Sequence, residues 1–266
     1  MTYQEIWTKG LKMLQNAGID DAEGNVSRLF KRVYGIDAAH FIMHRDEEAP
    51  PEKQLEFRLL IERRTKHEPL QYILGNCGFM GWDFLVDPRV LIPRQDTETL
   101  VETFLDDVVR ARPRETLKIA DMCTGSGCVG ISVQLGLRQR GYDSQMTLSD
   151  ISVEALAVAR KNAERLGVKP WLVISDMFRH LGRYHAILCN PPYIPHEECD
   201  RLMPEVSWHE PRAALDGGPD GLDFYRRIAA EAIDHLLPGP GLYLEIGYDQ
   251  AKAVATILHD AGFTRI

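Results

Sequence analysis

The sequence has 266 residues, of which 44% are hydrophobic and 26% are charged, and its formal net charge is −8. This length allows one large domain with a small companion, and no run approaches the roughly 18 to 20 apolar residues that span a bilayer. The acidic balance argues against wide binding to a phosphate backbone, which needs clustered lysine and arginine. The charged, amphipathic start is unlike a secretory signal. We therefore expect a soluble cytoplasmic protein without a membrane or a direct nucleic-acid partner.

The first 75 residues predict a small helical domain. Apolar residues recur there at helical spacing, as at Val26, Leu29 and Phe30, and the breaks fall at glycines and at the EEAPPEK segment. The basic stretch RRTK at Arg63–Lys66 ends an amphipathic segment, and we interpret it as a solvated helix face.

Residues 76–94 mix aromatic, β-branched and proline residues in the manner of a short hairpin, which predicts a structured connector. The stretch that follows, DTETLVETFLDDVVR, predicts a helix with Asp96 or Thr97 as its cap. Acidic residues in its first turn agree with the helix dipole.

From Leu117 onwards, strand and helix patterns alternate. The predicted strands are 117–122, 146–150, 171–176, 185–190 and 241–247, and the predicted helices are 128–140, 153–167, 224–237 and 249–262. Such alternation predicts an α/β fold with a mostly parallel, Rossmann-like sheet covered on both faces. Ligands of these sheets bind at the carboxyl ends of the strands. The residues after Ala120, Leu148, Ile174 and Cys189 should therefore share one crevice.

The loop DMCTGSGCVG follows the first of these strands and opens a helix. Gly125, Gly127 and Gly130 match G-x-G-x-x-G, and Asp150 ends the next strand about 20 residues further on. Glycines let a ligand approach the backbone, and a carboxylate at that place can accept both hydroxyls of a ribose. The pattern predicts a nucleoside-containing cofactor, either a dinucleotide or S-adenosylmethionine.

Asp121 favours S-adenosylmethionine. A carboxylate at the start of the loop would repel a pyrophosphate at the helix N-terminus, but it can support the ammonium of a methionine group, directly or by ordering the loop. A purely loop-stabilising aspartate is the alternative interpretation. In SDMF, we expect Asp176 to bind the adenine amino group and Met177 to lie against the purine, although such a methionine is more often a core residue.

The segment CNPPYIP contains the candidate catalytic residues Asn190, Pro191, Pro192 and Tyr193. Consecutive prolines fix φ near about −65° and carry no N–H, which leaves the Asn190 side chain and the Pro191 carbonyl with few internal partners. Beside a methyl donor, these two acceptors could hold both hydrogens of a planar –NH2 group and orient its nitrogen for an in-line displacement. Pro192 would make this segment more rigid, and the ring of Tyr193 would pack on a planar amide or base. A rigid exit loop is the structural alternative.

The whole chain resembles the HemK/PrmC family of protein-(glutamine-N5) methyltransferases. The resemblance is carried by EPLQYILG at Glu68–Gly75, LIPRQDTE at Leu91–Glu98, DMCTGSG, SDMF, NPPYIP, EPRAALDGGPDGLDFYRRI at Glu210–Ile228 and LEIGYDQ at Leu244–Gln250. It implies a helical substrate-recognition domain at 1–75, a hairpin connector at 76–94 and a class I S-adenosylmethionine-dependent methyltransferase domain at 95–266. It also implies methylation of the glutamine in the Gly-Gly-Gln motif of class I peptide chain release factors, with S-adenosylhomocysteine as the second product.

By the family's motifs, Cys123 to Gly127, Asp150 and Met177 line the cofactor site, and Asn190 to Tyr193 hold the substrate amide. With the residues argued above, the predicted cofactor set is Asp121, Cys123, Thr124, Gly125, Ser126, Gly127, Asp150, Asp176, Met177 and Asn190. The PRQDTE stretch favours the family that modifies release factors. The related family that modifies a ribosomal protein resembles a PRSPIAEL pattern at the same position.

The chain departs from the family pattern at two places. Cys123 stands where the loop usually has its first glycine, and the family usually continues beyond GFTRI into its last strands, so we expect either a shortened sheet or an omitted tail. The five cysteines are odd in number and form no C-x-x-C pair, which predicts free thiols and no zinc site.

Three other functions remain open from the sequence. A nucleic-acid amino methyltransferase would use the same grip on a flipped base. A nicotinamide oxidoreductase is suggested by the glycine pattern alone, and a non-catalytic scaffold could retain the pocket without turnover.

Overall fold

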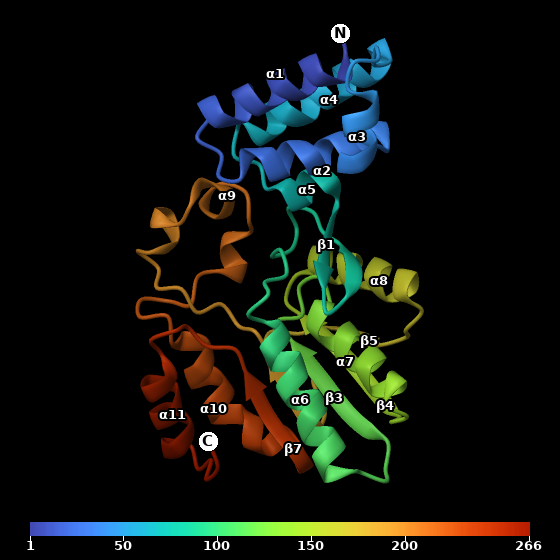
Figure 1. Ribbon diagram of the computed structural model, residues 1–266. Helices are drawn as coiled ribbons and strands as arrows, with labels where there is room; N and C mark the ends of the chain where they lie inside the picture. The colour runs from blue at the N-terminus through green and yellow to red at the C-terminus, as the bar shows by residue number, and fades with distance from the viewer. The chain divides into compact units, whose positions relative to one another are not determined.

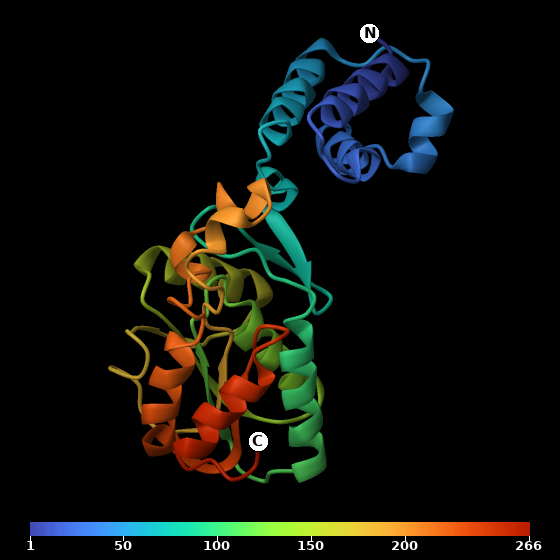
Figure 2. The ribbon, with the colours of Figure 1, turned by 90° about the vertical axis from the view of Figure 1, so that its left-hand side faces the viewer.

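The computed structural model describes residues 1–266, apart from the side chain of Ala38. It contains two compact units, which are described separately (Figures 1 and 2). The first comprises Met1–Gly75 with Pro204–His209, and the second comprises Asn76–Met203 with Glu210–Ile266. Within the described residues, no helix has the length and apolar character needed to cross a membrane.

The first unit is helical, as its sequence pattern predicts. Its helices are α1 (Tyr3–Asn16), α2 (Ala22–Tyr34), α3 (Ala38–His44), α4 (Pro51–Arg64), α5 (Leu70–Leu74) and α9 (Pro204–Ser207). Thr2 and Glu5 form a reciprocal capping box at the start of α1, and Gly35 ends α2 in the left-handed conformation. Leu29 and Phe30 are fully buried in the core of this unit.

Arg64 is the main correction to the sequence-based interpretation of this unit. Its side chain is only 7% exposed rather than solvated. Its Nε donates to Asn25 Oδ1 at 2.8 Å, and its Nη2 donates to Glu205 Oε1 at 2.8 Å. Burial raises the pKa of Glu205, but the hydrogen bonds from Arg64, the backbone and His67, together with the charge of Arg64, outweigh burial and hold that pKa below its usual value. This ion pair joins the Pro204–His209 segment to helices that lie far away in the sequence.

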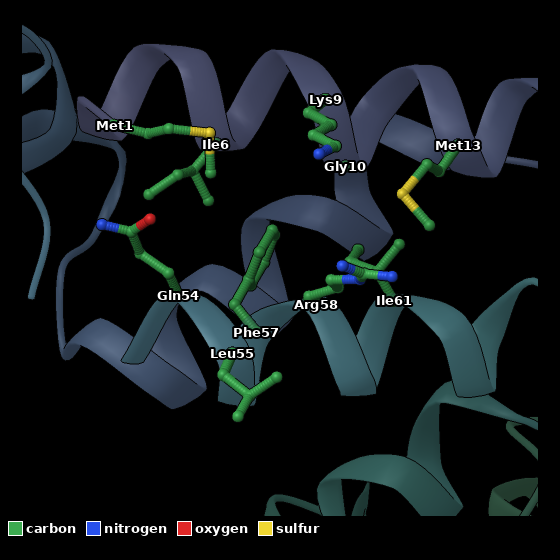
Figure 3. A pocket seen from close by; sticks show the side chains of 10 residues that line it. All are labelled: Met1, Ile6, Lys9, Gly10, Met13, Gln54, Leu55, Phe57, Arg58 and Ile61. Atoms are coloured by element: carbon green, nitrogen blue, oxygen red, sulfur yellow. The ribbon is translucent and has the colours of Figure 1, made fainter. Parts of the chain in front are cut away.

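A cavity of about 210 Å³ lies between α1 and α4 (Figure 3). Its lining residues are Met1, Ile6, Lys9, Gly10, Met13, Gln54, Leu55, Phe57, Arg58 and Ile61. Most of these side chains are apolar, and none is a predicted site residue. The candidate chemistry therefore lies in the second unit.

The second unit contains a hairpin and an α/β sheet. Its elements are β1 (Asn76–Phe79), β2 (Trp82–Leu85), α6 (Glu98–Ala111), β3 (Leu117–Met122), α7 (Cys128–Gln139), β4 (Ser144–Asp150), α8 (Val153–Leu166), β5 (Trp171–Ile174), β6 (Tyr184–Cys189), η1 (Cys199–Arg201), η2 (Arg212–Ala214), α10 (Asp223–His235), β7 (Leu236–Leu244) and α11 (Ala251–Asp260). The strands β1 and β2 pair antiparallel, which confirms the predicted hairpin. The five-stranded sheet has the order β5-β4-β3-β6-β7, and every neighbouring pair is parallel.

Alternate residues of β3 enter different cores. Ile119 belongs to the core formed with α6, α7 and α8, whereas Ala120 belongs to the core formed with α10. A strand directs successive side chains to opposite faces, so this alternation places helices on both faces of the sheet. Figure 1 shows the helices of the second unit around the sheet. The predicted covering of both faces is therefore confirmed.

The strand order reverses between β3 and β6. From β3 the chain adds β4 and then β5 on one side, and it returns to add β6 and β7 on the other. Met122 and Cys189 are register partners, so Cys123 and Asn190 leave neighbouring strands at the same edge. This is the switch point at which parallel sheets bind ligands.

Candidate active site

A cavity of about 540 Å³ opens at the carboxyl ends of β3, β4, β5 and β6. This volume lies in the range of about 300 to 1,000 Å³ that is usual for cofactor sites. Its lining includes these predicted site residues: Asp121, Cys123, Thr124, Gly125, Ser126, Asp150, Asp176, Met177, Asn190 and Pro192. The predicted residues Gly127, Pro191 and Tyr193 are not among the lining residues.

Two further segments contribute to the cavity wall. Arg89, Val90, Leu91, Pro93, Arg94 and Thr97 come from the chain between β2 and α6, and Pro211, Ala213, Ala214, Asp216, Phe224 and Arg227 come from the region around η2 and from α10. The buried Glu210 joins these segments, because its Oε1 lies 2.5 Å from Arg94 Nη2 and its Oε2 accepts from the Ile92 N–H at 3.2 Å. No local pattern marks these residues. Those from Leu91 onwards lie in two motifs that carry the resemblance, whereas Arg89 and Val90 lie outside both motifs.

Asp121 orders the glycine loop from inside. Its Oδ2 accepts hydrogen bonds from Thr124 Oγ1 at 2.5 Å and from the Gly130 N–H at 2.8 Å. Burial raises the pKa of Asp121 to about 7. The Gly130 amide belongs to the first turn of α7, where a phosphate would otherwise bind. Since the Gly130 N–H already donates to Asp121, the loop is poorly suited to bind a pyrophosphate. This geometry agrees with the interpretation that Asp121 orders the loop.

Gly130 is required for close packing between α7 and the sheet. A Cβ at this position would lie 2.3 Å from Leu148 Cδ2 and 2.9 Å from the Asp121 Cβ. At Gly125, by contrast, an added Cβ would meet nothing within 4 Å, and the requirement is its φ of +54°. The loop therefore uses one glycine for packing and another for its backbone conformation.

Cys123 occupies the left-handed region with φ of +55°, which glycine adopts more readily than any L-residue. We expect Cys123→Gly to be more stable than Cys123→Ala by about 1 kcal/mol, because both remove the thiol and only alanine keeps the strained Cβ. The midpoint of urea unfolding at constant slope measures this difference. Equal midpoints would show that position 123 is not left-handed in solution.

Asp150 links the end of β4 to the glycine loop. Its Oδ2 accepts from the Gly125 N–H at 2.9 Å, and its Oδ1 accepts from the Ser152 N–H at 2.9 Å. Burial raises the pKa of this carboxyl group. The side chain lines the cavity next to the loop, at the place expected for a ribose-binding carboxylate.

Asp176 and Met177 both line the cavity, and each also has a second contact: an ion pair for Asp176 and the hydrophobic core for Met177. Asp176 lines the cavity, and its Oδ1 lies 2.5 Å from Arg227 Nη2, so an ion pair engages one of its carboxylate oxygens. Met177 also lines the cavity, but it is buried and packs in the core beside Phe178. Met177 is therefore a core residue that also lines the cavity.

The segment that begins at Asn190 is held more firmly than its prolines alone would require. The Ile194 N–H donates to the Leu215 carbonyl at 2.9 Å, and the Gly217 N–H donates to the Ile194 carbonyl at 2.8 Å. A Cβ on Gly217 would lie 2.7 Å from the Tyr193 Cα. The chain at 215–217 therefore packs directly on this segment and stiffens it.

Tyr193 is held by Glu245. Its hydroxyl donates to Glu245 Oε1 at 3.3 Å, and its ring packs near the core formed by α10, α11 and β7. Burial and the nearby Glu245 raise the pKa of Tyr193 to about 12, so the hydroxyl keeps its proton. The structure does not place Tyr193 on the cavity wall, where a ring for the substrate was expected.

The parallel sheet, its switch-point cavity and the glycine loop with Asp150 define a class I S-adenosylmethionine-dependent methyltransferase. Family models for the methyltransferase small domain and the PrmC N-terminal domain match residues 95–210 and 5–75. The solved hMettl16 catalytic domain has a similar fold, with a TM-score of 0.51 and 14% identity over 81% of this chain and 75% of that chain.

Two relatives identify the family within this class. The chain is 40% identical over 259 residues to the release factor glutamine methyltransferase of Geobacter sulfurreducens. This alignment covers 97% of this chain and 87% of the relative. It is 38% identical over 258 residues to that of Bordetella pertussis, with coverage of 96% and 92%. The chain belongs to the release factor glutamine methyltransferase family, which confirms the resemblance seen in the sequence.

Proposed function

We propose that this protein transfers a methyl group from S-adenosylmethionine to the side-chain amide nitrogen of the glutamine in the Gly-Gly-Gln motif of class I peptide chain release factors. The observation that carries the proposal is that Asn190 lies in the same cavity as the glycine loop and Asp150. Membership of the release factor glutamine methyltransferase family supports the choice of substrate. The helical unit, which matches the PrmC N-terminal domain, would engage the release factor in the cytoplasm.

The residues of the cavity suit a cofactor without phosphate groups. Asp121 accepts a hydrogen bond from the helix amide that would otherwise bind a phosphate, and Asp150, which lines the cavity, would accept the ribose hydroxyls. S-adenosylmethionine, when bound, supplies a methyl group on a positively charged sulfur. The loop from Cys123 to Gly127 would hold its amino-acid portion, while Met177 would face the adenine.

Asn190 would orient the substrate amide. Its side-chain oxygen and the Pro191 carbonyl would accept the two amide hydrogens, which aims the nitrogen at the methyl carbon. With the cofactor bound, the N–C bond would form as its C–S bond breaks, and the methylated nitrogen would release its extra proton to water.

The direct test is transfer of a labelled methyl group to a class I release factor, beside the same factor with its Gly-Gly-Gln glutamine changed to alanine. We expect label on the unchanged factor only. Adenine-containing DNA and RNA serve as further substrates, and label on them instead would support a nucleic-acid methyltransferase. Label on neither protein, with cofactor binding intact, would overturn the proposal.

We expect Asp150→Asn to weaken S-adenosylhomocysteine binding by roughly 1.5 to 3 kcal/mol, the usual contribution of hydrogen bonds to a charged group. Asparagine keeps the shape but has one acceptor oxygen, so the expected loss combines the missing carboxylate with the loss of an acceptor for the N–H of Gly125 or Ser152. Isothermal titration calorimetry measures the affinity, and Asp143→Asn, at an exposed turn before β4, is the control. An unchanged affinity would remove Asp150 from the ribose-binding role.

A further inference from the structure

The Thr97 hydroxyl lies at the start of α6 but does not cap the helix. A threonine at the N-cap position normally accepts a hydrogen bond from a backbone N–H of the first turn. Thr97 makes no such bond, and its backbone is helical, with φ of −64° and ψ of −21°. Thr97 is the N-cap residue, one of the two predicted, but its side chain makes no capping hydrogen bond. Its side chain is 2% exposed, so water does not replace the missing partner.

The Thr97 hydroxyl is instead used at the active site. Its Oγ1 accepts a hydrogen bond from Asn190 Nδ2 at 3.2 Å, and Thr97 itself lines the cavity. This contact fixes one end of the Asn190 side-chain amide. An asparagine amide has nearly the same shape in either orientation, so its hydrogen-bond partners decide which end faces the cavity.

Glu245 stands behind this contact, immediately after β7. Its N–H donates to the Cys189 carbonyl at 3.0 Å, and its carbonyl accepts from the Tyr225 hydroxyl at 2.9 Å, so its backbone is held beside Asn190. Burial raises the pKa of Glu245, while hydrogen bonding with Thr97, Tyr193 and Asn190 opposes that shift. Tyr193 lies at hydrogen-bond distance from Oε1, and Oε2 is buried without a partner of normal geometry among the described residues.

The direction of these hydrogen bonds follows from the chemistry of the groups. When it is ionised, the Glu245 carboxylate only accepts, so it takes the hydrogen of the Tyr193 hydroxyl, and the Thr97 hydroxyl directs its hydrogen towards the same carboxylate. The remaining lone pairs of Thr97 Oγ1 then face Asn190, which must present its NH2 group there. The amide oxygen is left to accept from another donor.

We propose that Thr97 and Glu245 are positioning residues that orient the Asn190 amide so that its oxygen, and not its nitrogen, receives the substrate. This inference rests on the proposed function, because it assumes that Asn190 accepts a substrate N–H. It explains why Thr97, in PRQDTE, and Glu245, in LEIGYDQ, belong to one site. The same carboxylate anchors Tyr193.

The test compares Thr97→Val, which keeps the shape and removes the hydroxyl, with Thr97→Ser, which retains it. We expect Thr97→Val to lower kcat roughly 10- to 100-fold, with KM for the release factor and the affinity for S-adenosylhomocysteine changed less than about twofold. Thr97→Ser should restore most of the rate. Thr99→Val, at an exposed position two residues further along, is the matched control and should behave as the wild type.

Glu245→Gln provides a second variant, since glutamine can donate as well as accept and so removes the directional constraint. Its kcat should fall as in Thr97→Val, while urea unfolding shows that the protein remains folded. Wild-type kcat in Thr97→Val, or equal loss in the serine and valine variants, would overturn the inference. So would a fall in stability and cofactor affinity without a fall in kcat.

A readout without turnover separates this inference from the proposed function. The side-chain NH2 resonance of Asn190, assigned by its absence in Asn190→Asp, should exchange slowly with water in the wild type and faster in Thr97→Val. Unchanged exchange would overturn the inference. If exchange responds as expected but no release factor is methylated, the proposed substrate is wrong and the orientation of Asn190 stands.

Discussion

Asn190→Ala is expected to lower the turnover of release-factor methylation by roughly 2 to 4 kcal/mol in activation free energy, the usual loss when an oriented transition-state partner is removed. Asn190 lies at the carboxyl end of β6 and lines the cavity. Its oxygen would act mainly as the amide nitrogen gains positive charge, so the affinity for S-adenosylhomocysteine should remain nearly unchanged. Single-turnover rates at saturating cofactor measure the effect.

Two comparisons make this result specific. Asn16→Ala changes an exposed asparagine at the end of α1 and should leave the rate unaltered. Asn190→Asp keeps an acceptor oxygen but loses the NH2 group that donates to Thr97, so it should also be slow. Turnover at the wild-type rate in Asn190→Ala would contradict the two-acceptor mechanism.

Arg64→Met is expected to lower the free energy of unfolding of the helical unit by roughly 3 to 5 kcal/mol, because removing one partner of a buried ion pair leaves the other charge without compensation. The partner left behind is Glu205, and the Asn25 side-chain oxygen also loses its donor. Urea unfolding of the full chain, combined with hydrogen exchange of α1, α2 and α4, measures the change in this unit.

The neighbouring Arg63→Met is the matched control. Arg63 pairs with Glu68 at the surface, and exposed pairs contribute at most about 1 kcal/mol. The double variant Arg64→Met with Glu205→Leu should recover much of the loss, since no buried charge then lacks a partner. A change in Arg64→Met as small as that in Arg63→Met would show that the pair is solvated in solution.

The order of strands and helices after Leu117 follows from local patterns. The apolar run of β6 and the helical spacing in α8 and α10 depend on neighbouring residues, so each element could be predicted near its observed ends. The start of β7 is an exception, because it begins at Leu236 rather than near Gly241. Leu236 pairs with Tyr184 and Gly241 pairs with Ala186, so the strand begins earlier and passes an irregularity between these two pairs.

Side-chain partners were harder to predict than elements. Asp121 had two interpretations in the sequence, and only the position of Gly130 in the folded loop shows which hydrogen bonds it makes. Tyr193 was expected beside the substrate, and no pattern in the sequence indicated that its hydroxyl bonds Glu245, about 50 residues further on. Neither partner could be identified from spacing, because the contacts depend on how strands and loops pack.

The sequence by itself determined the parallel sheet, the hairpin, the helical unit and the loop that leads into α7, since these depend on local periodicity, glycine and proline. Its motifs also indicated the family. Only the tertiary structure decided that Arg64 is buried against Glu205. It also decided that the Thr97 hydroxyl accepts a hydrogen bond from Asn190 and does not bond a backbone N–H of its own helix. The physical reason is that a polar side chain bonds whichever partner folding brings within about 3 Å, and distance along the chain does not specify that partner.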